Sequence, residues 1–329
     1  MVSTWIAIAI PTLLAFLVWS SKHTALIQET LTANVDESGA ESKEDSNEAN
    51  LRQPYDVFLV LDVEGTCQRG SSFDYPNEII EFPVCLMKWK NDKERRELVV
   101  VDEFRSFVKP LWRPNLSKFC EELTGITQSQ VDRAPSFPEV LNSVFHFLVK
   151  NGVLEEASGE ALLRFAWCSD GPYDIRDFVV KTCFISKVTM PKWLRRDVLD
   201  VHKLVTDWHI TQNFRGRKMK ALLAPNHPKR PSLNIASQLR VLGLPAFEGR
   251  QHSGIDVGFV FNNPRYMSAL LHFLFILQDA RNIARIVAEC ALRDIYLRPN
   301  TAINPYRRWN WMAKSGEVVL EPWQSIIAL

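Results

Sequence analysis

Two carboxylates one residue apart, Asp62 and Glu64, are the side chains whose types and spacing first suggest chemistry. In an extended chain, residues i and i+2 point to the same side, so both carboxylates project together. Two carboxylates held this close repel each other unless a cation lies between them. Mg²⁺ or Mn²⁺ is the cation that suits oxygen ligands. The alternative is a strand end with two solvated acids, which is the commoner meaning of an isolated Asp-x-Glu.

A third acid and a histidine follow further along the chain. The segment FAWCSDGPYDI, residues 165–175, predicts a buried strand, a turn and then a helix. Asp170 and Asp174 both qualify as the third carboxylate, although Asp170 could instead cap the helix. His252 lies in a glycine-flanked loop, and histidine is the usual carrier of a proton near neutral pH. Taken alone, a loop histidine is more often a surface residue.

The elements that must position these side chains form a mixed sheet. Residues 57–61 are an uninterrupted apolar run, typical of a strand buried on both faces. Residues 78–90 and 97–109 predict two further strands of a meander, and residues 161–169 another buried strand. Sites in α/β sheets lie at strand ends, where the acids stand. Strands first, then alternating helices and strands, indicate a mixed α/β sheet covered by helices.

Helix signals are clearest where caps and glycine stops occur. Ser136 and Glu139 form a capping box, while Gly125, Gly152 and Gly243 are positioned to end helices. The predicted helices cover residues 115 or 117 to 125, 136–150, 173–187, 198–208, 232–242 and 279–297.

Composition limits the class of protein. A chain of 329 residues can bury a substantial core, so one domain of about 250 residues plus appendages is expected. Lys and Arg number 39 against 38 Asp and Glu, so binding of nucleic acid must depend on local patches. None of the six cysteines forms a C-x-x-C pair. They are therefore expected to be reduced core residues of an intracellular protein, not disulfides or zinc ligands.

Five motifs in order resemble the Eri-type 3′–5′ exoribonucleases, of the DEDDh group in the ribonuclease H-like superfamily. They are DVEGT, NEIIEFP, LTGIT, DGPYD and GRxHSGID, and the resemblance runs from about Tyr55 to Asp294. It implies an α/β fold with a ribonuclease H-like mixed five-stranded sheet flanked by helices. It also implies two Mg²⁺ or Mn²⁺ ions per site and release of nucleoside 5′-monophosphates from RNA 3′ ends, single-stranded or with a short overhang. No dinucleotide cofactor is expected.

The resemblance also implies roles for single residues. Asp62 and Glu64 match the first pair of metal ligands, and Asp174 matches the third because an aromatic residue precedes it. His252 matches the general base that takes a proton from the attacking water. Asp170 falls where many relatives carry Asn, so it is expected to support a ligand.

Two further segments are candidates for substrate binding. The residues Leu123, Thr124 and Ile126 match the family segment that packs on the terminal nucleotide, unless this is only a helix end folded onto the core. A basic stretch between Phe214 and Arg230 can neutralise RNA phosphates, or can be a solvated surface loop. Its basic residues are Arg215, Arg217, Lys218, Lys220, Lys229 and Arg230.

The sequence departs from the family after His252. The family has an aspartate five residues later as its fourth metal ligand, but Val257 stands there and the matching DARNIARIV begins only at Asp279. Asp279 is therefore predicted to be the displaced ligand. The intervening residues 257–278 begin with Val, whose codons start with GT, and end with Gln, which CAG can encode. This fits a short retained intron read in frame. A true lid or a membrane-touching loop is the alternative, with Asp256 as a partial ligand.

The chain thus divides into four predicted parts. Residues 1–30 are an apolar N-terminal segment (an anchor, a signal-like segment or a gene-model artefact), and residues 31–53 a disordered acidic linker. Residues 54–298 are the exonuclease domain with an insertion at 257–278, and residues 299–329 a C-terminal extension. The expected location is cytoplasmic or nuclear, with membrane anchoring by residues 5–19 as the alternative.

Three functions remain open from the sequence. The first is a metal-dependent 3′–5′ exoribonuclease, with small-RNA or rRNA 3′-end processing as its biological setting. The second is a DNA-directed 3′–5′ exonuclease, because the sequence does not show what reads the 2′-hydroxyl. The third is an inactive RNA-binding relative, if the inserted residues disable the site. Nothing resembles the N-terminal nucleic-acid-binding module of some animal members, so recognition of a histone messenger stem-loop is not implied.

Overall fold

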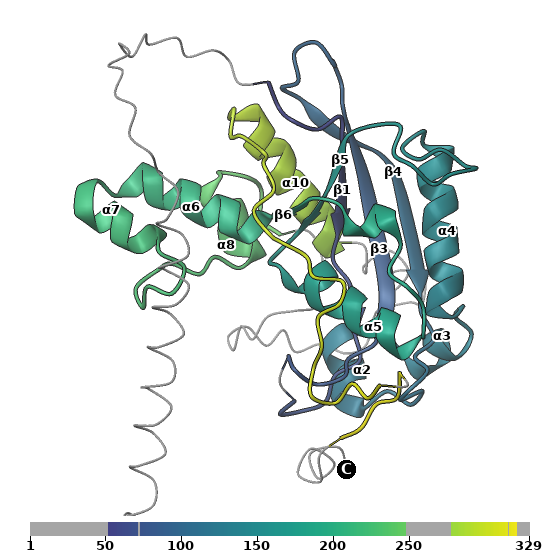
Figure 1. Ribbon diagram of the computed structural model, residues 1–329. Helices are drawn as coiled ribbons and strands as arrows, with labels where there is room; N and C mark the ends of the chain where they lie inside the picture. The colour runs from purple at the N-terminus through teal and green to yellow at the C-terminus, as the bar shows by residue number, and fades with distance from the viewer. Residues whose placement is uncertain (1–51, 72, 248–277, 315, 321–329) are drawn as a thin grey trace, which may run out of the picture. The chain divides into compact units, whose positions relative to one another are not determined.

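A mixed six-stranded sheet is the centre of the computed structural model, which describes residues 52–71, 73–247, 278–314 and 316–320 (Figure 1). The described residues fall in one compact unit, Leu51–Leu329. The strands run in the order β2-β3-β1-β5-β6, with β4 on the other edge of β3. β5 pairs in parallel with β1 and β6, and the other pairs are antiparallel. The strands are β1 (Val57–Leu61), β2 (Glu64–Gly65), β3 (Ile79–Trp89), β4 (Leu98–Phe107), β5 (Phe165–Ser169) and β6 (Val198–Asp200).

The central position of β1 follows from its sequence. All five of its residues are buried, because β3 and β5 pair with its two edges and helices cover both faces. Val57, Leu59 and Leu61 contribute to the core on one face, while Phe58 and Val60 contribute to the core on the other. The predicted central strand is therefore confirmed.

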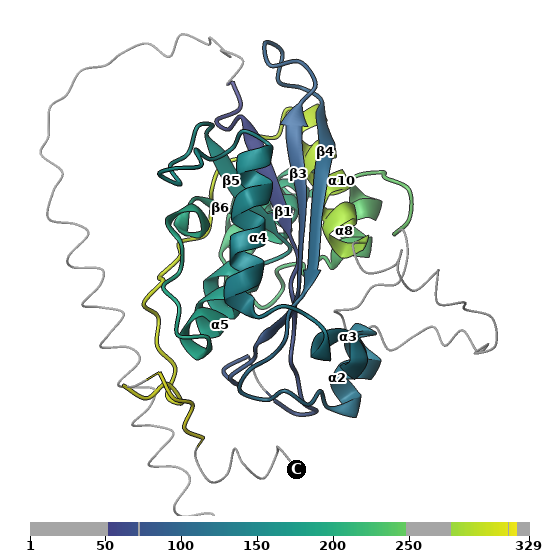
Figure 2. The same ribbon diagram turned by 90° about the vertical axis from the view of Figure 1, so that its right-hand side faces the viewer.

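Helices cover the two faces of the sheet (Figures 1 and 2). One face packs against α4 (Phe137–Lys150), the π-helix η1 (Asp174–Val179) and α5 (Val180–Ile185). The other face packs against α6 (Val201–Asn213), α8 (Ile235–Val241) and α10 (Gln278–Leu292). The remaining helices are α2 (Lys118–Thr124), α3 (Gln128–Asp132), the 3₁₀ helix η2 (Lys192–Arg195) and α7 (Gly216–Leu223).

Several predicted elements differ from the observed ones. The expected five strands become six in the described part of the chain, because the two residues of β2 pair with β3. The helix predicted from residue 198 begins at Val201, since Val198–Asp200 extends the sheet as β6 and the Asp200 side chain caps the helix. The basic stretch predicted as a loop contains the helix α7. All six cysteines are free thiols, as expected.

The segment after α10 packs back onto the domain. Trp309, Trp311 and Met312 are buried in the core that also contains α4 and α5. The indole of Trp311 donates a hydrogen bond to the Asp74 carbonyl over 2.6 Å, and Arg307 forms an ion pair with Asp177 of the π-helix. Residues 307–312 therefore support the helix that carries Asp174.

The apolar segment at residues 5–19 lies outside the described residues. In the part of the chain that is described, none of the helices has the length and apolar character needed to cross a membrane.

Candidate active site

Three carboxylates converge at the end of the central strand. Asp62 directly follows β1, Glu64 is the first residue of β2, and Asp279 lies in the first turn of α10. One carboxylate oxygen from each residue lies within 4.8 Å of the other two. Asp62 and Glu64 are half-buried, while Asp279 is buried. A donor set of three carboxylate oxygens fits a hard divalent cation such as Mg²⁺ or Mn²⁺.

Asp174 is joined to this group through the backbone. It begins the π-helix, it is buried, and its Oδ1 accepts a hydrogen bond from the amide of Val63 over 2.9 Å. Val63 stands between Asp62 and Glu64, so the hydrogen bond brings Asp174 beside the pair. π-Helical turns are rare in proteins overall, and those that do occur are often found at functional sites.

Gly65 allows the π-helix to come this close. A Cβ atom placed on Gly65 would lie 2.6 Å from Cε1 of Phe178, which is shorter than any normal carbon contact. The Phe178 ring, from the π-helix, therefore occupies the space beside β2 that a side chain would need. This contact sets the separation between the strand that carries Glu64 and the helix that carries Asp174.

The electrostatics of the group favour a bound cation. Removal from water, then repulsion by Asp279 and Asp174, raise the pKa of Asp62 well above its usual range. Burial raises the pKa of Asp174 to about 7, although the amide of Val63 opposes the shift. A cation between carboxylates removes the repulsion that disfavours their charged forms. The residues therefore fit the divalent metal that the sequence predicted.

Asp170 is held from the other side of the site. Its Oδ1 accepts a hydrogen bond from Nε2 of Gln238 on α8 over 2.6 Å. Burial raises its pKa to about 6, and its charge in turn raises the pKa of both Asp62 and Asp174. Asp170 thus lies beside the ligands with its own partner on α8. Its supporting role stays a prediction.

Sequence reasoning missed an exposed aromatic pair next to Asp174. Phe73 and Tyr173 stack with ring centroids 4.6 Å apart and planes 15° apart. They remain 59% and 39% exposed, and the guanidinium of Arg176 lies 5.2 Å from the Tyr173 ring. Stacked aromatic rings beside a cation are a surface on which nucleic-acid bases can stack. Tyr173 was the sequence signal for this pair, but it served only to match Asp174 to the third metal ligand of the family.

A buried acid on β3, Glu81, was also missed. It lies opposite Glu64 across the β2–β3 pair and bonds to Arg105. Burial and then repulsion by Glu81 raise the pKa of Glu64. The sequence does carry a signal for a buried acid, since Glu81 is the one charged residue in the apolar run IIEFPV. That run was interpreted only as a family motif.

The predicted nucleotide-packing residues differ in exposure. Leu123 is 37% exposed at the end of α2, whereas Thr124 and Ile126 are buried. The Thr124 hydroxyl donates to the Cys120 carbonyl over 2.8 Å and accepts from the Ile126 amide over 3.1 Å. These two residues close the helix end and pack into the core, and their contact with the terminal nucleotide stays a prediction.

The basic residues between Phe214 and Arg230 also divide into two groups. Arg215 donates to backbone carbonyls at the end of α6, and Arg230 pairs with Asp207 over 2.7 Å. Both residues therefore hold the α6–α7 hairpin together. The exposed cations are Arg217, Lys218 and Lys220 on α7, together with Lys229 in the loop after it. The hairpin projects from the sheet beyond β6 (Figure 1).

His252, the predicted base, lies outside the described residues, as does most of the inserted segment. Only Gln278, the last inserted residue, is described, and it is the first residue of α10. Asp279 follows it directly and joins Asp62 and Glu64. The displaced aspartate thus occupies the position expected of a fourth ligand, although its binding of metal stays a prediction.

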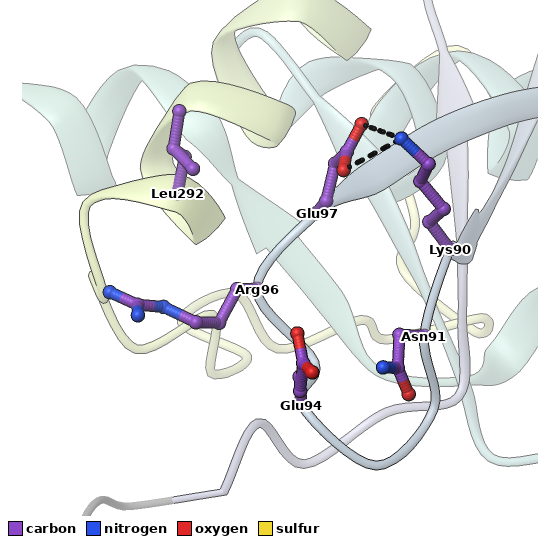
Figure 3. Close-up of a pocket in the computed structure, with 6 residues that line it drawn as sticks. All are labelled: Lys90, Asn91, Glu94, Arg96, Glu97 and Leu292. Carbon is purple, nitrogen blue, oxygen red and sulfur yellow. Dashed lines mark hydrogen bonds and ion pairs between the residues drawn. The ribbon is translucent and has the colours of Figure 1, made fainter.

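A surface pocket of about 500 Å³ lies away from these acids (Figure 3). It is formed by the hairpin between β3 and β4 together with Leu292 of α10, and the Lys90–Glu97 ion pair crosses it. Lys90 follows the end of β3, whereas Glu81 stands near its start. The pocket therefore lies at the opposite end of this strand and brings none of the converging acids together.

Comparisons with known proteins agree on one family. The family model RNase T, described as Exonuclease, matches residues 59–225, just over half of the chain. The chain is 29% identical over 269 residues to the 3′-5′ exonuclease eri1 of Schizosaccharomyces pombe, covering 78% of this chain and 74% of that protein. It is 29% identical over 252 residues to the 3′-5′ exoribonuclease 1 of Rattus norvegicus, covering 76% of this chain but only 57% of that protein.

A solved structure shows the same similarity. The nuclease domain of 3′hExo, a DEDDh family member bound to rAMP, matches with a TM-score of 0.55 and 26% identity. The match covers 76% of this chain and 98% of that one.

Proposed function

The chain belongs to the exonuclease family, as an Eri-type 3′–5′ exoribonuclease of the DEDDh group with a ribonuclease H-like fold, and on this basis we propose how its residues act on RNA. The substrate is an RNA 3′ end, single-stranded or with a short overhang, and the products are nucleoside 5′-monophosphates. The observation that carries the proposal is the convergence of Asp62, Glu64 and Asp279 within 4.8 Å.

Four carboxylates would hold two Mg²⁺ or Mn²⁺ ions: Asp62, Glu64, Asp174 and Asp279. When bound, the ions supply positive charge that lowers the pKa of a water ligand and offsets the charge on the departing 3′ oxygen. The protein fixes the positions of the ligands. The Val63 amide orients Asp174, and Asp279 stands at a helix N-terminus, where a carboxylate is favoured.

His252 is the proposed general base, from its place in the GRxHSGID motif. It would accept the proton of the attacking water, and for this role its imidazole is neutral. Since the ordinary pKa of histidine is about 6.5, activity should fall as the pH decreases below about 6.5.

The terminal nucleotides are proposed to stack on the aromatic pair. Phe73 and Tyr173 present their rings next to Asp174, and Arg176 adds a positive charge. Of the three residues predicted at the end of α2, Leu123 alone offers side-chain surface. Stacking accepts any base, so this contact would bind RNA 3′ ends with little regard to sequence.

Upstream phosphates are proposed to bind the exposed cations of α7. No acidic residue occurs between Asp207 and Glu248, so the field around Arg217, Lys218 and Lys220 is not offset along this stretch. A track of this kind holds the backbone and does not specify sequence.

The test is degradation of 5′-labelled single-stranded RNA by the purified full chain in Mg²⁺. Wild type should give a ladder that shortens from the 3′ end, and EDTA should stop it. Asp62→Asn and Asp279→Asn should each reduce the rate by a factor on the order of 10³ while the melting temperature does not fall. DNA of the same sequence is the comparison substrate. Full activity of either variant, or cleavage unaffected by EDTA, would contradict the proposal.

A further inference from the structure

Glu81 is a further carboxylate beside the metal centre, and it is not one of the three whose oxygens converge. It lies on β3 directly opposite Glu64 on β2. Residues opposite each other in an antiparallel pair project from the same face of the sheet. Glu64 is half-buried, whereas Glu81 is 0% exposed. The carboxylate of Glu81 therefore lies on the same face as that of Glu64 but deeper in the protein.

Arg105 holds Glu81 from the other side. Nε of Arg105 lies 2.5 Å from Oε1 of Glu81, and the side chains are 16% and 1% exposed. The guanidinium also lies 4.7 Å from the centre of the Phe107 ring. Both β2 and β4 pair with Glu81, so they occupy opposite edges of β3. Glu81 thus stands between a metal-centre acid on one neighbouring strand and a cation on the other.

A buried carboxylate at position 81 is not needed for the stability of the fold. Burying an ion is costly even when it is paired, and an apolar or neutral residue would often be as stable. Yet Glu81 stands directly opposite Glu64 in the β2–β3 pair. Burial raises the pKa of Glu81 to about 7, and the Arg105 charge opposes this rise and favours the carboxylate. The side chain therefore adds negative potential where carboxylates already repel one another.

We propose that Glu81, held in place by Arg105, sets the affinity of the centre for its divalent cation without binding that cation. The inference builds on the proposed metal-dependent function. The carboxylate charge of Glu81, which the Arg105 guanidinium favours, lies behind the ligands. This charge favours a cation in front of the ligands, because the attraction acts through the protein interior. Arg105 keeps this charge in one position, so that Glu81 does not move forward and compete with Glu64 as a ligand. Both are positioning residues.

The experiment measures Mn²⁺ binding to the RNA-free full chain by titration calorimetry. Glu81→Gln should raise the Kd about tenfold, the order expected for removal of one nearby unit charge. Glu81→Asp keeps the charge and should stay within about threefold of wild type. In RNA degradation, Glu81→Gln should shift the half-saturating Mg²⁺ concentration by a similar factor. At saturating Mg²⁺, kcat should change little.

Glu78→Gln is the matched control. Glu78 directly precedes β3, is 1% exposed, and accepts hydrogen bonds from the backbone amides of Leu111, Trp112 and Arg113. Its substitution should lower the melting temperature and leave the Mn²⁺ Kd unchanged. Asp62→Asn should abolish the binding heat and so identify the centre as its source.

An unchanged Kd in Glu81→Gln would overturn the inference and leave Glu81 with a structural role. Should that variant fail to fold, the pair Glu81→Gln with Arg105→Gln removes both buried charges and is measured in its place. The expected result is again weaker binding, and an unchanged Kd again overturns the inference. The binding readout is separate from nuclease activity. A wild type that binds Mn²⁺ but leaves RNA intact would therefore contradict the proposed function without affecting this inference.

Discussion

At the scale of single residues, the site depends on the absence of a side chain at Gly65. Cε1 of the Phe178 ring lies 2.6 Å from the place that a Cβ of residue 65 would take. Gly65→Ala should push the ring away and separate β2 from the π-helix, which carry Glu64 and Asp174. We expect a loss of about 1–3 kcal/mol in the free energy of unfolding, as for overpacking elsewhere. Weaker Mn²⁺ binding should accompany it, as measured by calorimetry.

Phe178→Leu provides the control for this prediction. Leucine has no ring edge at the site of the clash, so Gly65→Ala combined with Phe178→Leu should recover part of the lost stability and Mn²⁺ affinity. Additive losses in the double variant would show that the ring is not what Gly65 accommodates.

The acids themselves could be predicted from sequence, but their neighbours could not. Asp62 and Glu64 follow an apolar run, and their spacing alone places them on one side of an extended chain. The position of Glu81 beside Glu64 could not be predicted, because it depends on the register between two strands. The burial of Thr124 and Ile126 could not be predicted either, because a motif shows position along the chain and not burial.

At the scale of elements, Asp56 joins three segments at the start of β1. Burial alone would raise its pKa, but hydrogen bonds from Arg164 and Arg95 outweigh burial and lower the pKa to about 2 from 3.8. This stabilisation is present above pH 3.8 and is lost as the pH falls from 3.8 towards 2. Asp56→Asn should therefore be less stable at pH 7 by at most about 2 kcal/mol.

Urea denaturation of wild type and Asp56→Asn at several pH values checks this prediction. The difference between the two should shrink as the pH is lowered from 4 to about 2. Glu97→Gln is the control, because Glu97 and its partner Lys90 are 55% and 64% exposed. Its effect should be no more than about 0.5 kcal/mol. A difference between Asp56→Asn and wild type that stays constant with pH would assign the effect to something other than the carboxylate charge.

The helix α7 gives a second prediction at this scale. Replacement of Arg217, Lys218 and Lys220 by Gln should weaken RNA binding and reduce the slope of log Kd against log salt by about 2. Cleavage of a trinucleotide, which has no upstream phosphates for α7 to bind, should be affected least. The measurement is RNA affinity at several salt concentrations.

Arg230→Gln separates binding from folding in the same hairpin. Arg230 pairs with Asp207 and bonds to the carbonyls of Leu222 and Leu223. Its loss should lower the melting temperature, with a smaller effect on the salt slope. If the slope of log Kd against log salt is unchanged in the triple variant, α7 is a solvated surface helix that does not bind RNA.

Elements with strong caps or long apolar runs could be predicted, whereas the shortest ones could not. Ser136, Glu139 and Gly125 marked helix ends that the structure confirms. β2 and β6 have two and three residues, and they are strands only because a neighbouring strand supplies their hydrogen bonds. The π-helix has no sequence signal of its own. It replaces the first turns of the helix predicted from Tyr173.

At the scale of the whole molecule, contacts between α10 and the sheet hold Asp279 in place. Ile283, Ile286 and Val287 bury the helix against the sheet, and Arg281 forms a two-point ion pair with Glu103 at 2.7 and 2.6 Å. We expect a variant lacking residues 257–278 to bind Mn²⁺ as wild type does. It should degrade RNA faster, because His252 then stands five residues before Asp279.

Parallel calorimetry and RNA degradation with the two forms test this expectation. Equal rates would remove the reason to regard residues 257–278 as foreign to the enzyme. A transcript pool that contains only the longer form would do the same for the retained intron.

The distance along the chain between Asp62 and Asp279 has a consequence for biosynthesis. Ribosomes add about 5–20 residues per second, so more than ten seconds separate the synthesis of these two ligands. During that interval the nascent chain is attached to its own messenger, which is RNA, and lacks a complete centre. The set of carboxylates is therefore complete only late in synthesis, after residue 279 has been added. Ribosome-bound chains stalled before residue 279 should leave added RNA intact in Mg²⁺, whereas released full-length chains should degrade it.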